Sequence, residues 1–186
     1  MNKKVFSLIC AVSCSFIWGT AFVAQDMGMD YIGPYTFSAV RLLLGFLTLL
    51  PFFFIFEFKK VKETKLSLNI IFSYLFFLGF FLAGGNILQQ ISLLYTDVAN
   101  SAVFTVLYVV IVPIIAYFLF SKKIHKSVWP SVLMCLVGGL FLSELNNLRV
   151  RYGDSLVVVG AFFWAFHIVF ISKFLKIFNY PITIAT

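Results

Sequence analysis

Charged side chains are scarce in this sequence. Asp, Glu, Lys and Arg together make up 11% of the 186 residues, whereas hydrophobic residues make up 62%. A soluble domain usually has about a quarter of its residues charged. The charges also cluster, and the windows between them reach about the 20 residues that a helix needs to cross a bilayer. The scarcity of charged residues favours a polytopic membrane protein, and we therefore expect the lipid bilayer to be one of its partners.

Groups that catalyse reactions or bind metals are lacking as well. The three cysteines, Cys10, Cys14 and Cys135, lie inside apolar segments and fit neither a disulfide framework nor a metal site. Zinc, phosphate-loop and nucleophile-elbow patterns do not occur, and no carboxylate lies in the central part of a predicted span. We therefore expect no catalytic activity, no cofactor and no metal site.

Six apolar runs predict six transmembrane helices. Helices are expected because each run is continuously apolar and can satisfy its own backbone hydrogen bonds in lipid. The alternation of a membrane β-barrel is absent, so the predicted fold class is all-α. The predicted spans cover residues 5–24, 34–56, 68–93, 98–120, 128–142 and 155–171.

The first run has an alternative interpretation. Lys3 and Lys4, followed by apolar residues, are similar to a secretory signal, and AVSC ending at Cys14 is similar to a lipoprotein cleavage site. The run nevertheless continues to Ala24, which gives it about the length of a membrane span. We therefore expect this segment to be retained as the first helix.

The links between the runs indicate the orientation of the chain. Most basic residues lie in links on one side of the predicted membrane, so the net charge of +7 suits a bilayer better than nucleic acid. The opposite links carry Asp26, Asp30 and Asp97, with Arg149 and Arg151 as their basic residues. The positive-inside rule then places the amino terminus in the cytoplasm and the spans in the cytoplasmic membrane. The lysines of the predicted cytoplasmic side are Lys3, Lys4, Lys59, Lys60, Lys62, Lys65, Lys122, Lys123, Lys126, Lys173 and Lys176.

Two landmarks indicate an internal repeat. Aligning Trp18 with Trp164 sets SFIWGTAFV against AFFWAFHIV, an offset of 164 − 18 = 146. Pro34 of PYTF aligns with Pro181 of PITI at an offset of 181 − 34 = 147. Five predicted spans separate the two tryptophans, so the second copy enters the membrane from the opposite face, as in inverted-repeat transporters.

The same residues resemble a known family. WGTAFVAQ in the first span, GPYTFSAVRLLLG (33–45), a fourth span that contains Pro113, and GGLFL in the fifth are similar to EamA-type members of the drug/metabolite transporter superfamily. The resemblance implies ten helices in two inverted five-helix units, which export or import amino acids, metabolites or drugs. Members often carry a glutamate in a GER-like turn after the fourth span, whereas this chain has SKK with Lys122.

The repeat and the resemblance together predict the domain organisation. Residues 1–145 are expected to form the first unit, and residues 146–186 the start of the second, inverted unit. The chain is then a truncated or fragmentary carrier that lacks four helices. We expect it to be inactive alone, and to need either the missing carboxyl-terminal helices or a second copy in a homodimer.

Polar residues inside the spans are the candidates for a solute site, because an unsatisfied polar group in hydrocarbon costs roughly several kcal/mol. Arg41 lies roughly 10 Å along the second span from Pro34. It could bind a substrate carboxylate, or its side chain could instead extend to the outer interface. Asn86 and Gln90, four residues apart, could line a cavity or form hydrogen bonds between helices.

Aromatic residues complete the candidate substrate-binding set. Trp18 and Trp164 could stack on an organic solute or a cation, or could serve as packing and interface anchors. Tyr108 shares a helical stripe with two polar residues of the fourth span. His167, the one histidine inside a span, is a candidate too, although a hydrogen-bonded structural role is the simpler interpretation.

These features favour a transporter that moves a small organic solute across the cytoplasmic membrane by alternating access. A non-transporting helical membrane subunit or fragment is the alternative. A membrane-embedded enzyme has the least support, because the sequence contains no catalytic triad, metal cluster or carboxylate pair. The DNA that follows the codon of Thr186 would discriminate between the first two hypotheses.

The lysine asymmetry makes a prediction about topology. A reporter fused after Lys62 or Lys126 should report the cytoplasm, and one fused after Asp30 or Asp97 the opposite side. Paired reporters that are active on only one side of the membrane measure this directly. Reversed signals at the four positions would show that the orientation is wrong.

Overall fold

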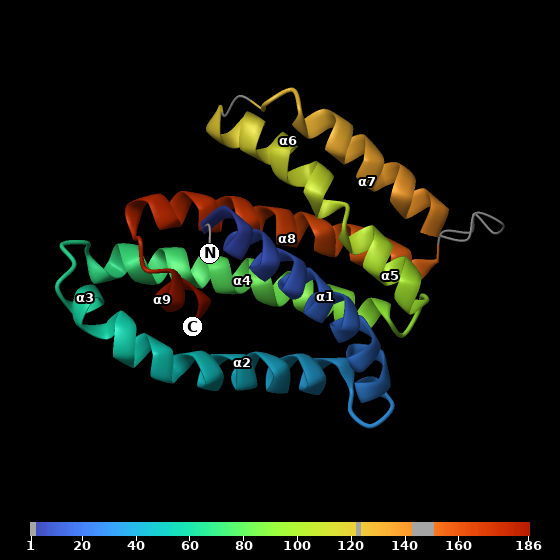
Figure 1. The fold of residues 1–186 in the computed structure, drawn as a ribbon. Helices are drawn as coiled ribbons and strands as arrows, with labels where there is room; N and C mark the ends of the chain where they lie inside the picture. Colours follow the sequence, from blue (N-terminus) through green and yellow to red (C-terminus); the bar gives the residue numbers. More distant parts are fainter. Residues whose placement is uncertain (1–2, 122–123, 143–150) are drawn as a thin grey trace.

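Figure 1 shows the computed structural model of the chain, which describes residues 3–121, 124–142 and 151–186. Every regular element in these ranges is an α-helix, which confirms the predicted fold class. The helices are α1 (Lys3–Met29), α2 (Pro34–Phe56), α3 (Phe58–Lys62), α4 (Leu68–Ser92), α5 (Val98–Thr105), α6 (Tyr108–Phe120), α7 (Val128–Leu142), α8 (Tyr152–Ile177) and α9 (Pro181–Ala185).

The lengths of these helices fit a membrane. Within the described ranges, five helical stretches are long and apolar enough to cross one: α1, α2, α4, the combined stretch Val98–Phe120 and α8. The apolar part of α7, Val128–Gly139, is shorter. Large apolar side chains cover much of the outer surface of the bundle, as expected where lipid replaces water. The chain is therefore a polytopic membrane protein.

The fourth and sixth spans differ from their predicted form. Val106 and Leu107 separate α5 from α6, and the N–H of Val109 bonds the carbonyl of Val106 at 2.9 Å, so the helix tightens locally. Pro113, further along α6, has no N–H for the helical ladder. Helix α8 runs from Tyr152 to Ile177 and thus extends beyond the predicted span 155–171 at both ends.

Helix α8 lies in the middle of the bundle, where it packs against α4, α5 and α6 (Figure 1). Gly160, Ala161 and Ala165 are buried on its packing face. Small side chains let helix backbones approach closely, and close packing is what holds helices together in lipid. A Cβ atom added to Gly160 would already lie 3.4 Å from the Cβ atom of Leu88 on α4.

Backbone atoms meet where α8 begins. A Cβ atom added to Gly153 would lie 2.7 Å from the carbonyl oxygen of Ser92 and 2.9 Å from the backbone nitrogen of Thr96. The carboxylate of the neighbouring Asp154 accepts hydrogen bonds from Thr96 Oγ1 at 2.5 Å and from the backbone N–H of Arg151 at 2.8 Å. These contacts tie the first turn of α8 to the end of α4.

At the opposite end of α8, aromatic residues and a carboxylate hold the helices. Phe174 is fully buried and stacks on Tyr74 of α4, with ring centroids 4.6 Å apart. Glu57, which follows α2, accepts hydrogen bonds from the backbone N–H groups of Ile182 at 3.1 Å and Thr183 at 2.6 Å. The first turn of α9 is thereby capped by the end of α2.

The helix ends that carry lysines gather on one side of the bundle. Figure 1 shows the start of α1, helix α3 and the end of α8 on that side, and the α1–α2 link, the α4–α5 link and the start of α8 on the other. This separation agrees with the sides assigned from the sequence. Lys122, Lys123 and Arg149 lie outside the described residues.

The contact at Gly153 generates a stability prediction. Gly153→Ala should lower the melting temperature of the purified protein, because the new methyl group meets backbone atoms of Ser92 and Thr96, and overpacking costs about 1–3 kcal/mol. Gly79→Ala is the matched control on α4, since nothing lies within 4 Å of the Cβ position of Gly79. Equal melting temperatures for the two variants would contradict the prediction, because they would show that the start of α8 can move away from the end of α4 at little cost.

Candidate functional site

Two aromatic residues, from two other helices, contact the ring of Trp18 on α1. The rings of Trp18 on α1 and Tyr108 on α6 lie 6.1 Å apart between centroids and are nearly parallel, at 14°. Trp164 on α8 approaches Trp18 from another side, with ring centroids 5.9 Å apart. Tyr108 is in reach because the turn at Val106 and Leu107 starts a new helix at this residue.

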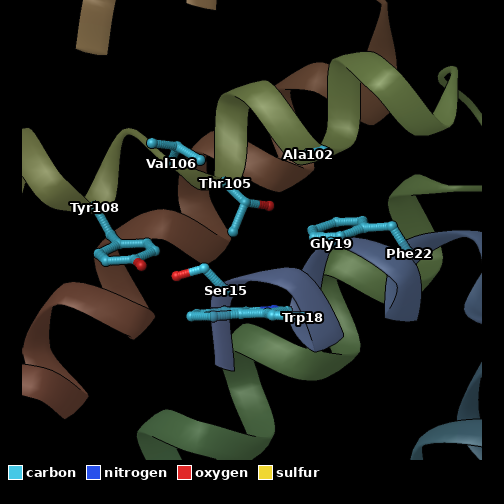
Figure 2. A pocket seen from close by; sticks show the side chains of 8 residues that line it. All are labelled: Ser15, Trp18, Gly19, Phe22, Ala102, Thr105, Val106 and Tyr108. Carbon is cyan, nitrogen blue, oxygen red and sulfur yellow. The ribbon is translucent and has the colours of Figure 1, made fainter. Parts of the chain in front are cut away.

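A pocket of about 290 Å³ opens beside the rings of Trp18 and Tyr108. Figure 2 shows Trp18 and Ser15 of α1 on one wall, and Thr105 and Tyr108 on the facing wall. The hydroxyl groups of Ser15, Thr105 and Tyr108 add polar atoms to a mostly apolar lining, which is the usual make-up of a small-molecule site. The pocket is lined by Ser15, Trp18, Gly19, Phe22, Ala102, Thr105, Val106 and Tyr108.

The position of Trp164 depends on a glycine of α4. A Cβ atom added to Gly85 would lie 3.0 Å from Cδ1 and Nε1 of the Trp164 ring, so the ring lies directly on the α4 backbone. His167, one turn further along α8, lies edge-on to the same ring at 6.2 Å between centroids. It donates a hydrogen bond from Nδ1 to the carbonyl of Leu78 at 3.0 Å.

Arg41 and Asn86 form a polar pair between α2 and α4. The guanidinium of Arg41 donates a hydrogen bond to Oδ1 of Asn86, and Nδ2 of Asn86 donates to the carbonyl of Leu82 at 2.9 Å. The guanidinium also lies 5.9 Å from the ring centroid of Phe37. Within the part of the chain that the structure describes, no carboxylate forms a salt bridge with Arg41.

A chain of buried hydrogen bonds runs from α4 to α5. Nε2 of Gln89 donates to Oγ1 of Thr105 at 2.9 Å, and Thr105 donates to the carbonyl of Ser101 at 2.7 Å. The hydroxyl groups of Ser101 and Ser92 are 3.1 Å apart. Since Thr105 lines the pocket, this chain holds one of the pocket's hydroxyl groups in place.

Gln90 points to a different helix from its neighbour Gln89. Its Nε2 atom donates a hydrogen bond to the backbone carbonyl of Gln25 on α1 at 3.3 Å. Gln25 and Gln90 are both buried, with 2% and 0% of their surfaces exposed. Gln90 therefore connects α4 to α1, whereas Gln89 connects α4 to α5.

Comparison with known proteins identifies the family. The sequence profile of the EamA-like transporter family matches residues 5–144. This chain belongs to the EamA-like transporter family. The resemblance predicted from the motifs is thereby confirmed.

Two curated relatives of this EamA-like chain carry transporter names. It is 27% identical, over 95% of its length, to an uncharacterized transporter of Archaeoglobus fulgidus. It is 28% identical, over 86% of its length, to the uncharacterized transporter YoaV of Bacillus subtilis. The matches cover 52% and 54% of those proteins, so the EamA-like chain spans about half the length of the curated relatives it matches. No solved structure matches it.

The structure of the EamA-like chain brings the sequence-predicted candidates into two groups. The aromatic group consists of Trp18, Tyr108 and Trp164, with His167 beside it. The polar group consists of Asn86 with Arg41, and of Gln90 one turn further along α4. The two groups adjoin at Gly85, which supports Trp164 and directly precedes Asn86.

Sequence reasoning missed several residues that contribute to this region. Gln89 was not selected, because an apolar span gives no sign of which helix a given face meets. Thr105 was placed on the stripe of Tyr108, but it was interpreted as a packing residue. Ser15 and Phe22 line the pocket although neither stood out in the sequence. A general search for amide and hydroxyl side chains inside apolar runs would have found Gln89 and Thr105.

Proposed function

We propose that this chain forms part of a carrier that moves a small organic solute across the cytoplasmic membrane by alternating access. The observation that carries the proposal is that Trp18, which lines the pocket, also contacts Trp164. These two tryptophans are the landmarks that align in the two copies of the sequence repeat, and their rings are 5.9 Å apart. In inverted-repeat carriers the solute binds where the two repeats meet.

The directions of the helices support an inverted repeat. Figure 1 shows that α1 and α8, which carry the aligned tryptophans, run in opposite directions. Pro34 and Pro181, the second pair of aligned landmarks, each take the first position of a helix. We therefore assign residues 1–145 to a first unit and residues 146–186 to the start of a second. Because the relatives are about twice as long, the solute path is completed by further helices or by a second copy.

Arg41 indicates the kind of solute. A cationic side chain inside a membrane is costly unless it is hydrated or paired. The described residues offer Arg41 an amide and an aromatic ring but no anionic partner. We assign to Arg41 the binding of a carboxylate or similar anion on the solute. Trp18, Tyr108 and Trp164 then pack around its apolar part, while Asn86 orients the guanidinium.

The remaining candidates have supporting roles in this proposal. His167 holds Trp164 from the side and is itself bound to the α4 backbone. Gln90 lies beside the anion site on the next turn of α4. We place the amino terminus and the lysine-bearing helix ends on the cytoplasmic side. We further propose that the Arg41–Asn86 pair lies on the path of the solute.

Replacement of Arg41 tests the proposed function. In proteoliposomes at a protein density where cross-linking detects paired copies, saturable uptake of radiolabelled 3-phenylpropionate is expected. Arg41→Ala should reduce this uptake about tenfold or more, because a hydrogen bond to a charged group contributes about 1.5–3 kcal/mol.

Leu43→Ala is the matched control on the same helix, since Leu43 is 56% exposed on the outer surface of the bundle. Its uptake should equal that of the unmodified chain at the same amount of inserted protein. Equal uptake by both variants would mean that Arg41 is an interface anchor. If the unmodified chain shows no saturable uptake, the proposal of transport by paired copies is wrong.

A further inference from the structure

Another pocket lies at the lysine-bearing end of the bundle, where the short helix α3 joins α2 to α4 (Figure 1). Its volume is about 300 Å³, near the lower end of the range for small-molecule sites. Most of the residues around it are apolar, so the pocket suits a hydrocarbon segment better than a polar metabolite. The lining residues are Phe53, Phe58, Val61, Lys62, Thr64, Leu66 and Leu68.

Helix α3 has an apolar side and a basic side. Phe58 and Val61, three residues apart, share one side and line the pocket. The ring of Phe58 meets the ring of Phe53 edge-on, with centroids 5.9 Å apart, and this contact joins α3 to the end of α2. Lys59 and Lys62 share the adjoining side of the helix. A basic amphipathic helix at the end of a membrane span is typical of the layer of lipid headgroups.

Three lysines lie on or next to the lining of this pocket. Lys62 lines it directly, and Lys59 lies one turn earlier on the same side of α3. Lys65 stands between Thr64 and Leu66, which both line the pocket. All three lysines are exposed, and none of them forms a salt bridge within the part of the chain that the structure describes. Their charges are therefore available to an anion.

The carboxylates of this segment do not neutralise the lysines. Glu57 is buried, and its carboxylate accepts hydrogen bonds from the backbone N–H groups of Ile182 and Thr183. Glu63 follows α3 and is exposed, and it forms no salt bridge with any of the described residues. The pocket thus combines an apolar lining with basic charge that has no counterpart in the described chain.

We propose that this pocket binds a phospholipid with an anionic headgroup. Its phosphate pairs with Lys59, Lys62 and Lys65, and the first part of one acyl chain enters the apolar lining. Basic residues next to a membrane span attract anionic lipids, and an acyl chain is stabilised where apolar surface is removed from water. An anion without a chain would leave the lining uncovered. The site is separate from the pocket at Trp18 and does not depend on solute transport.

Lipid binding to the purified full chain tests the proposal. In native mass spectrometry of the detergent-solubilised chain, dioleoylphosphatidylglycerol should bind at least about tenfold more tightly than dioleoylphosphatidylcholine, because each nearby lysine strengthens the binding of an anionic lipid about fivefold. Lys62→Gln combined with Lys65→Gln should remove most of this preference. Lys3→Gln combined with Lys176→Gln is the matched control, since both lysines are exposed and neither lines the pocket.

The apolar half of the site has its own variant. Phe58→Ala removes part of the wall without changing the charge and should weaken the binding of dioleoylphosphatidylglycerol. Phe56→Ala should not, because Phe56 is an exposed phenylalanine outside the lining. Inorganic phosphate in excess should leave the bound lipid in place, since it has no chain to enter the pocket. Circular dichroism verifies that each variant keeps its helices.

Several results would overturn the proposal. Equal binding of the two lipids, or an unchanged preference after replacement of Lys62 and Lys65, would show that these lysines only orient the chain in the membrane. An equal loss in the Lys3 and Lys176 control would show attraction to net charge without a site. Displacement of the lipid by inorganic phosphate would show an anion site alone. Full lipid binding by Phe58→Ala would show that the acyl chain stays outside the pocket.

Discussion

The close approach of α8 to α4 is the interaction on which the rest of the structure depends. In lipid, helices gain little from hiding apolar surface, so their association rests on tight contact between backbones. Gly160, Ala161 and Ala165 make this contact possible on α8, and Gly85 does so on α4. The same contact lays the Trp164 ring on α4, where it also contacts the ring of Trp18. Packing and site geometry therefore depend on the same small residues.

The fold could be predicted well because length and apolarity are properties of a single segment. The predicted spans 34–56 and 128–142 have the same bounds as α2 and α7. The turn at Val106 and Leu107 could not be predicted, since both residues are as apolar as their neighbours. The predicted start of α8, residue 155, was too late because the charged Asp154 interrupts the apolar run. In the structure Asp154 lies inside the helix, since Thr96 and the backbone N–H of Arg151 donate hydrogen bonds to its carboxylate.

The candidate site could be predicted only in its parts. Helical spacing selected Gln90 because it lies four residues after Asn86, but it could not show that Gln90 meets α1 while Gln89 meets Thr105 on α5. The pairing of Arg41 with Asn86 depends on the register between two helices, which no single segment encodes. Functional residues inside a membrane are recognisable by polarity, whereas their partners follow from the packing.

The carboxylate of Glu57, at the end of α2, couples the position of this helix to that of α9. Glu57 holds the first turn of α9 at one end, and Arg41 lies on the same helix, roughly 24 Å away at 1.5 Å per residue. Pro51, between them, interrupts the hydrogen-bond ladder and is the natural point of bending. A displacement of α9 would thus move the part of α2 that follows Pro51. The movement would be passed on to Arg41 only to the extent that the helix does not bend at Pro51.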